Sequence, residues 1–283
     1  MNIFNEYKLS GALGSGAFGE VWKAIHIQSN KEVAIKIDFH KKTNNLKKEA
    51  IILRFLKKCN LVPKLIYYGK TNSYNFLIID LLDQTIFSYF DSKIKNLDSK
   101  LSSEELKERK CNLLKWIGLK MLECIKQVHQ NGIVHMDIKP ENFLMTKDNN
   151  NIKIIDFGLS RKYLDLNGQH KMNKYSDRLS GTIRYLSCFL HDGYNGFRRD
   201  DLVSFVYSLI FIFENKLPWQ DVKCKNKYEK IEAVYKIKSN ISNHDLTKNI
   251  SPKMTILIDY VYSLEYNEDP DYEFIKTLFD LLI

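Results

Sequence analysis

The segment HMDIKPENFLM, at residues 135–145, brings together side chains that suit phosphoryl transfer. Asp137 can accept the proton of an attacking hydroxyl group or orient it, and Lys139 can neutralise the transferred phosphoryl group. Asn142 can hold a metal ion through its amide oxygen, and Asp156 in IIDFGLS offers a second oxygen ligand on a turn. Because Mg²⁺ prefers oxygen ligands, these residues predict a magnesium site beside a phosphate-bearing substrate.

A glycine-rich stretch, GSGAFGEV, places Gly14, Gly16 and Gly19 at G-x-G-x-x-G spacing. Glycines let the backbone of a hairpin come close enough for its N–H groups to lie over phosphates. Dinucleotide-binding folds share this spacing, but they require a helix directly after the glycines. Here the strand-like run EVWKAIHI follows, which favours a phosphate-covering hairpin; a plain glycine turn is the alternative.

The run VAIK ends in Lys36, within the next strand-like segment. A lysine in this place can pair with the α and β phosphates of a nucleotide if a carboxylate holds it in position. Glu49, in the one helical segment of this region, is the natural partner. The alternative is that both residues are solvated surface charges, as most lysines and glutamates are.

A region of short strand-like runs precedes a region of long helical stretches, with no linker rich in Gly or Pro between them. This order predicts an α+β fold with a small antiparallel β region at residues 1–82 and a larger helical region at 83–283. We expect strands at residues 7–13, 19–27, 32–39, 64–69 and 74–80, and helices at residues 44–59, 102–130, 199–216, 228–240, 252–266 and 271–282.

Three local signals refine this outline. Ser102 or Ser103 begins a Ser-x-x-Glu pattern that predicts a capping box. The apolar run from Phe205 to Phe213 is far shorter than a membrane span and predicts a buried helix. The polar stretch DNNN, at residues 148–151, predicts a hairpin turn between two short strands.

Composition points to an ordinary globular protein, with 283 residues, 44% hydrophobic and 27% charged. The five cysteines form no C-x-x-C pair, which favours reduced thiols inside a cell. The first residues show no signal peptide. A net charge of +9 suits phosphorylated proteins, nucleic acid or anionic membrane, or else reflects lysines scattered over the whole sequence. We therefore expect an intracellular protein of the cytoplasm or nucleus, without a membrane span.

The motifs occur once each and in one order: glycine loop, VAIK, helix glutamate, H-x-D-x-x-x-x-N and DFG. The chain resembles eukaryotic protein kinases over essentially its whole length, and most closely the casein kinase I group. The specific likenesses are HMDIKPENFLM, GTIRYLS, FRRDDLVSFVYSL, LPWQ and YNFLIIDLL. The chain lacks the Ala-Pro-Glu of kinases at large, as that group does, and it has LSCF where the group usually has Ser-Ile-Asn. The last difference lies in the expected substrate-binding loop.

The resemblance implies a bilobal protein kinase fold that uses ATP and Mg²⁺, with Lys36, Asp137 and Lys139 as catalytic residues and Asn142 and Asp156 as metal ligands. It also implies that Asp201 braces the catalytic loop. The residues expected to bind ATP are Leu13, Gly14, Gly16, Gly19, Val21, Ala34, Lys36, Glu49, Ile79 as gatekeeper, Asp80 and Leu82 in the hinge, and Leu144.

Arg184 and Lys227 match basic positions that bind a phosphate already present on the substrate in that group. Two basic residues converging on an anion would each add a charge-assisted hydrogen bond of about 1.5–3 kcal/mol. The alternative for Lys227 is ordinary surface charge, since it lies within KCKNKYEK.

Met136 stands where many kinases have an arginine that pairs with a phosphorylated activation loop. Methionine cannot make this pair, but it takes no part in the chemistry at the γ-phosphate. We therefore expect a kinase that is active without phosphorylation at Tyr175, Ser176 or Ser180.

The predicted function is a monomeric Ser/Thr protein kinase of casein kinase I type, acting on acidic or pre-phosphorylated proteins and not on nucleic acid. One alternative is a catalytically weak, ATP-binding scaffold. Another is a phosphotransferase for small molecules, although Lys139, Thr182 and the RRDD helix favour a protein substrate. The segment at residues 91–111 looks longer than the usual link between two helices and is expected to be a surface loop, or a docking surface. The sequence stops at Ile283, so we expect no regulatory tail.

Overall fold

The computed structural model describes residues 5–16, 19–39, 44–98, 101–175 and 179–281. These residues form two compact units. The first consists of Met1–Asp83 with Leu144–Ser160, and the second of Gln84–Phe143 with Arg161–Ile283. The division of the chain at residue 82 remains a prediction about its domains.

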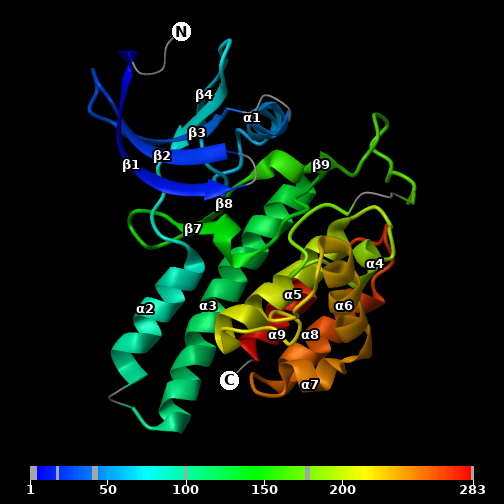
Figure 1. Cartoon of the computed structure of the whole chain (residues 1–283). Coiled ribbons are helices and arrows are strands. Elements are labelled where there is room, and N and C mark those ends of the chain that lie inside the picture. The colour runs from blue at the N-terminus through cyan, green and yellow to red at the C-terminus, as the bar shows by residue number, and fades with distance from the viewer. Residues whose placement is uncertain (1–4, 17–18, 40–43, 99–100, 176–178, 282–283) are drawn as a thin grey trace. The chain divides into compact units, whose positions relative to one another are not determined.

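The first unit is built on an antiparallel sheet of five strands in the order β1-β2-β3-β5-β4 (Figure 1). All five predicted strands are present, and β1 with β2 forms the hairpin that carries the glycine-rich stretch. The strands are β1 (Tyr7–Gly16), β2 (Gly19–His26), β3 (Glu32–Asp38), β4 (Leu65–Lys70) and β5 (Asn75–Asp80).

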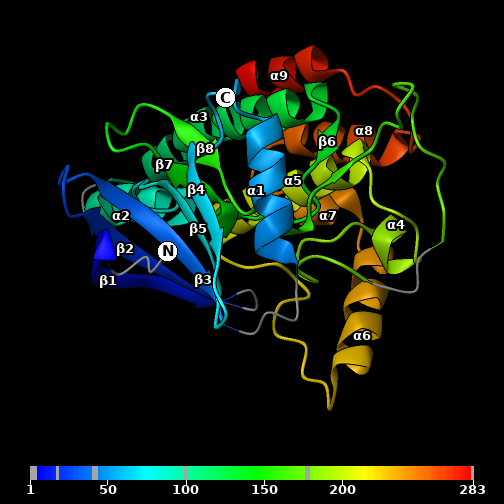
Figure 2. The same ribbon diagram turned by 90° about the horizontal axis from the view of Figure 1, so that it is seen from above.

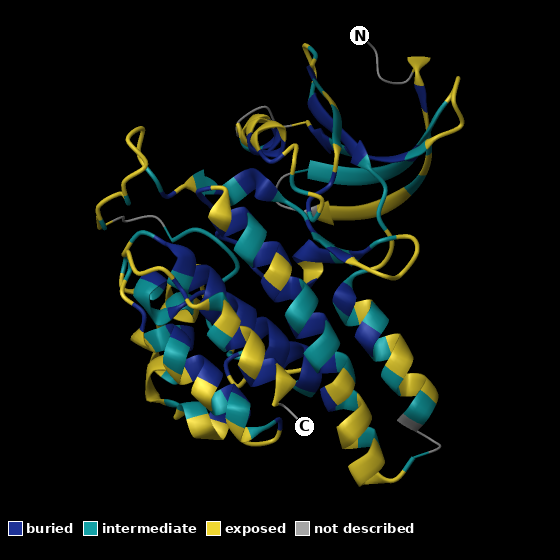
Figure 3. Cartoon of the chain, turned by 180° about the vertical axis from the view of Figure 1, so that it is seen from behind, coloured by how far each residue is buried: buried dark blue, intermediate teal, exposed yellow. Residues whose placement is uncertain are grey.

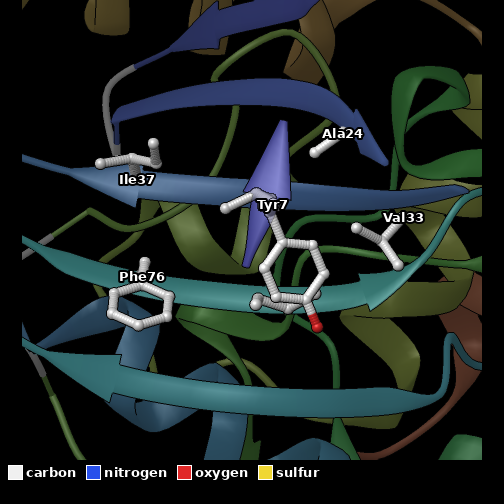
Figure 4. Packing of buried hydrophobic residues seen from close by; sticks show 7 residues of the cluster. Tyr7, Ala24, Val33, Ile37 and Phe76 are labelled. Carbon is white, nitrogen blue, oxygen red and sulfur yellow. The ribbon is translucent and has the colours of Figure 1, made fainter. Parts of the chain in front are cut away.

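One face of this sheet carries the hydrophobic core of the unit. Val33, Ile35 and Ile37 alternate along β3 and pack with Tyr7 and Phe76 (Figure 4). Because side chains alternate between the faces of a strand, Ala34 and Lys36 must lie on the opposite face. The alternation in VAIK therefore buries one set of residues and leaves the other set for a ligand.

Helix α1 (Asn45–Phe55) packs against β4 and β5 and against a 3₁₀ turn at Phe157–Leu159. Its buried side chains include Leu46, Ala50 and Leu53, at the spacing of one helix face. Glu49 is buried on the same helix, with a relative exposure of 1%. A buried carboxylate needs a partner, and it finds one in the candidate site described below.

The predicted hairpin after residue 142 is confirmed. Strand β7 (Phe143–Met145) pairs with β8 (Ile152–Ile154), and Asn149 in the turn has a φ of 56°. Asparagine tolerates this left-handed conformation better than most residues. The hairpin brings the chain to Asp156.

The second unit is helical, with a two-stranded pairing of β6 (Ile133–Val134) and β9 (Arg161–Lys162). Buried residues run through the middle of this unit (Figure 3), and every residue from Phe205 to Phe213 is buried, as predicted. No helix in the described part of the chain is long and apolar enough to cross a bilayer. The helices are α2 (Ile86–Asp98), α3 (Ser103–Gln130), α4 (Cys188–His191), α5 (Arg198–Glu214), α6 (Lys227–Asn240), α7 (Asn243–Thr247), α8 (Pro252–Ser263) and α9 (Tyr272–Asp280).

The expectation of a surface loop within residues 91–111 is wrong for most of the described residues, and the expected helix from residue 102 is confirmed. Residues 91–98 continue α2, and Ser103 begins α3, which packs against α2. Ser102 caps α3 in a capping box with Glu105, which resolves the choice between Ser102 and Ser103. Most of the described residues of this segment thus belong to α2 and α3.

Candidate active site

In the first unit, Lys36 lies between two carboxylates. Its Nζ atom is 2.7 Å from Oε1 of Glu49 and 3.3 Å from Oδ1 of Asp156. The Lys36 side chain is 12% exposed and the Glu49 side chain 1%. The predicted pairing of strand lysine and helix glutamate is present in the structure, and the alternative of two solvated surface charges is wrong.

Burial and charge oppose each other at Lys36. Burial alone would lower the pKa of the lysine, but the carboxylates of Glu49 and Asp156 outweigh it and raise that pKa above its ordinary value. The ammonium group therefore stays charged at neutral pH. A permanent cation held on two carboxylates suits the binding of phosphate oxygens.

Asp156 has a backbone φ of 69°. Five described residues other than glycine have positive φ, and three of them are asparagines. The other two are Met136 and Asp156, which both belong to the motifs that carry the predicted chemistry. Strained backbone concentrates at functional sites, so these two values support a functional role for both segments.

The strand register gathers four of the expected ATP-binding residues on one face of the sheet. Val21 is opposite Lys36, and Ala34 is opposite Ile79. Residues directly opposite each other in an antiparallel pair project to the same face, and so do residues two apart on a strand. Val21, Ala34, Lys36 and Ile79 therefore share the face opposite the hydrophobic core.

The remaining expected nucleotide-binding residues flank this face in the chain. Gly14 pairs with Val21, and Gly16 pairs with Gly19 where β1 turns into β2. Gly19 has a φ of 121°, and a Cβ atom there would lie 2.0 Å from the carbonyl oxygen of Ile37, so only glycine fits. Residues 17 and 18 of the loop lie outside the described residues.

Leu13 is 53% exposed on β1. Leu82 and Leu144 come near each other through the backbone, because the N–H of Asp83 donates to the carbonyl of Met145 at 2.9 Å. The carboxylate of Asp80 accepts hydrogen bonds from the backbone of Lys64 and from Nζ of Lys153, at 2.6 and 2.9 Å. The side chain of Asp80 is thus hydrogen-bonded within the unit, and its backbone is the part that can bind a nucleotide.

In the second unit, Asp137 is the centre of a hydrogen-bonded cluster. Nζ of Lys139 donates to Oδ2 of Asp137 at 2.6 Å. The amide nitrogen of Asn142 donates to the carbonyl oxygen of Asp137 at 2.8 Å. The three residues grouped by the motif are therefore in contact, with Asn142 at the end of a 3₁₀ turn at Pro140–Asn142.

Thr182 is a fourth member of this cluster. Its backbone N–H and its hydroxyl both donate to Oδ1 of Asp137, at 2.9 and 2.7 Å, and the hydroxyl accepts from Lys139 at 3.0 Å. Thr182 was expected to favour a protein substrate, but its contact with Asp137 was not predicted. The two residues are 45 positions apart, and no spacing rule connects them.

Asp201 on α5 holds the backbone before Asp137. Its carboxylate accepts the N–H groups of His135 and Met136, at 2.6 and 2.8 Å, and Nε2 of His129 at 2.9 Å. Burial raises the pKa of Asp201, but these donors more than offset it and lower that pKa below its usual value. Burial lowers the pKa of His129, so a neutral imidazole donates to an ionised carboxylate.

A family comparison agrees with this geometry. The family model of the protein kinase domain matches residues 7–272. The chain belongs to the protein kinase family. The predicted protein kinase fold is thereby confirmed, and the protein is a phosphotransferase that acts on protein substrates.

In this kinase, the side chain of Met136 is buried. It is 7% exposed and packs on Gly196, where an added Cβ would lie 2.4 Å from the methionine Cε atom. Arg161 donates to the carbonyl oxygen of Gly196 at 2.6 Å and to Asn195 at 3.0 Å. Hydrogen bonds from Arg161 to uncharged acceptors therefore join the strand after Asp156 to the segment before α5.

Arg184 and Lys227 are not in contact with each other in the described structure. The guanidinium of Arg184 lies over the rings of Tyr185 and Phe211, 5.7 and 5.2 Å from their centroids. Lys227 is the first residue of α6 and is exposed. Their joint role as a phosphate site stays a prediction.

The two expected metal ligands belong to different units. Asn142 uses its amide nitrogen on the carbonyl of Asp137, which leaves its amide oxygen as the group able to ligate a cation. Asp156 supplies a carboxylate that is 23% exposed and shared with Lys36. Both groups are hard oxygen ligands of the kind that Mg²⁺ prefers, so the residues fit the ion.

Proposed function

We propose that this protein is a Ser/Thr kinase of casein kinase I type, which transfers the γ-phosphate of ATP to acidic or pre-phosphorylated proteins. The observation that carries the proposal is the cluster of Asp137, Lys139 and Thr182, held in place by Asp201. A scaffold that only docks partners has no need for a lysine, a threonine and an amide converging on one carboxylate.

The roles follow from the chemistry of the side chains. Asp137 accepts or orients the proton of the substrate hydroxyl, since its two oxygens are fixed by Thr182 and Lys139. Lys139 neutralises negative charge on the transferred group. Lys36 binds the α and β phosphates while Glu49 keeps its ammonium in position.

Mg²⁺ would be held by Asn142 and Asp156 together with the phosphates of ATP. When bound, it would neutralise charge that develops on the phosphate oxygens. The sheet face of Val21, Ala34 and Ile79 would accommodate the adenine ring, with Leu144 on the other side.

We further propose that activity does not require a phosphorylated activation loop. Met136 offers no positive charge to a phosphate, and its side chain is buried against Gly196. Arg161 is already bonded to Asn195 and to the backbone of Gly196. Ordering of this region therefore has a source that is present before any modification.

The test is transfer from labelled ATP with magnesium onto casein. Asp137→Asn keeps the shape of the side chain and should abolish transfer, whereas Asp148→Asn, in an exposed turn, should leave the rate unchanged. The labelled residues should be Ser and Thr. A folded wild-type protein that binds ATP but transfers nothing to casein would point to the scaffold alternative.

A further inference from the structure

The loop Ile183–Leu186 has all four of its backbone carbonyl oxygens bound by side chains. These residues belong to the GTIRYLS motif, and the donors come from α5, from α6 and from the segment between them. The four hydrogen bonds are Lys238 Nζ to Ile183 O at 2.9 Å, Trp219 Nε1 to Arg184 O at 2.7 Å, Ser204 Oγ to Tyr185 O at 2.7 Å and Lys238 Nζ to Leu186 O at 2.6 Å.

Lys238 makes two of these four bonds and is itself buried, with a relative exposure of 5%. A third, longer contact runs to Nε2 of His191 on α4 at 3.5 Å, and α4 packs beside α6 (Figure 2). The rings of Tyr207 and Trp219 lie 5.2 and 5.1 Å from Nζ. Among the described residues, no carboxylate forms an ion pair with Lys238.

An ammonium group without a carboxylate is an unfavourable group to bury. Burial lowers the pKa of Lys238 to about 7. Methionine would fill a similar volume in the helix without this penalty, so the contribution of the lysine lies in its hydrogen bonds. Its two shorter bonds end on the loop, and the longer contact goes to His191 on α4.

The loop is connected directly to the cluster around Asp137. Thr182, which precedes it, donates two hydrogen bonds to Asp137. Gly181 has a φ of 106°, and a Cβ there would lie 2.8 Å from the carbonyl oxygen of Met136. The start of the loop is thus fixed by the catalytic segment, and the rest of it is fixed by Lys238, Trp219 and Ser204.

We propose that Lys238 is a positioning residue that fixes the Ile183–Leu186 loop for binding of the protein substrate. The proposal rests on the kinase activity described above and adds a residue that touches neither ATP nor Asp137. Lys238 also helps to fix Arg184, because its two acceptors, the carbonyl oxygens of Ile183 and Leu186, lie on either side of Arg184 in the chain. Loss of Lys238 should therefore weaken recognition of an acidic substrate more than it slows phosphate transfer.

The first experiment compares Lys238→Met with Lys236→Met, which makes the same change at an exposed position of the same helix. Initial rates are measured with casein varied at saturating ATP, and with ATP varied at saturating casein. For Lys238→Met we expect the KM for casein to rise about tenfold, with kcat and the KM for ATP within about twofold of wild type. Lys236→Met should match wild type in all three.

Hydrogen exchange of the amides at residues 182–187 gives a second readout that does not depend on activity. Exchange should be about tenfold faster in Lys238→Met and unchanged in Lys236→Met. If the wild-type protein transfers no phosphate to casein but the exchange result is as expected, the proposed kinase function is wrong, whereas the anchoring of the Ile183–Leu186 loop by Lys238 is supported. Unchanged exchange together with an unchanged KM for casein would overturn the proposal.

Ser204→Ala provides a variant that is expected to fold even if Lys238→Met does not. It removes one hydroxyl donor to the loop and changes the volume little. We expect the KM for casein to rise about threefold, with kcat unchanged. A fall in kcat with no change in KM would contradict a role in substrate binding.

Discussion

Two largely buried lysines in this kinase are stabilised in opposite ways. Lys36 in the first unit pairs with the carboxylates of Glu49 and Asp156, and its pKa is raised. Lys238 in the second unit bonds to two backbone carbonyls, and burial lowers its pKa to about 7. A lysine that must present charge to phosphates is kept charged by anions, whereas a lysine that must hold a loop needs donors more than charge.

The largest effect should come from removing the cation that meets ATP. Lys36→Met should lower kcat/KM by about a thousandfold, because a preorganised charge on the phosphates is lost. The measurement is the steady-state rate on casein with ATP varied. A loss smaller than tenfold would mean that Lys36 does not act on the phosphates.

The same variant should also destabilise the fold, in contrast to Lys238→Met. Lys36→Met leaves the buried carboxylate of Glu49 without its cation, which costs about 3 kcal/mol. The double variant Lys36→Met with Glu49→Gln should recover most of this loss in urea unfolding, but none of the activity. Failure of the second change to restore stability would show that the loss is not due to the stranded carboxylate.

The pH dependence of stability should distinguish the two lysines. For Lys238, the folded pKa of about 7 lies below the ordinary value of 10.5, so between these values the unfolded chain holds a proton that the folded chain has released. The stability contributed by this group therefore rises with pH, by at most about 1.4 kcal/mol per unit. The pKa of Lys36 is raised, so its favourable contribution to the stability of the fold is retained between pH 7 and 10.5.

The measurement is urea unfolding from pH 7 to 10, with the slope for Lys238→Met subtracted from that of wild type. Its neighbours are Cys188 and His191 on α4, Tyr207 on α5, and Trp219. Burial raises the pKa of Cys188 and of Tyr207 and lowers that of His191 to about 3, so none of them carries a charge near pH 7. Parallel slopes in the two proteins would mean that Lys238 does not titrate in this range.

The smallest effect on activity is expected from substitutions at the phosphorylatable residues of the activation loop. None of the contacts described for Lys36 and Lys238 involves a phosphorylated residue. Tyr175→Phe and Ser180→Ala should each leave kcat/KM within about twofold of wild type. Ser176, the third candidate, lies outside the described residues and is tested in the same way. Strong activation on phosphorylation of any of the three would contradict independence from the loop.

Much of the fold and part of the site could be predicted from the sequence. The strands of the first unit follow from alternation, and the buried α5 follows from its apolar run. The contact between Lys36 and Glu49 was predictable because each residue type has a defined role in an ordered set of motifs. These features depend on patterns that recur at fixed spacing.

Other features depend on contacts between residues far apart in the sequence, and no local sequence pattern indicates these contacts. Thr182 reaches Asp137 only because the segment between them folds back. Lys238 left a weak signal, since Ile231, Val234 and Lys238 follow helical spacing and place a lysine on the inward face of α6. Its acceptors gave none, because a backbone carbonyl has the same chemistry in every residue.

The use of backbone carbonyls as acceptors affects how the loop can change in evolution. Since the Ile183–Leu186 loop is anchored through its carbonyls, the bonds persist whatever side chains the loop carries, as long as the backbone path is kept. Mutations at Ile183 or Arg184 can then alter which proteins are recognised without releasing the loop. Substrate preference can thus change while the donors Lys238, Trp219 and Ser204 stay the same. We expect these donors to tolerate substitution less well than the side chains of Ile183 and Arg184.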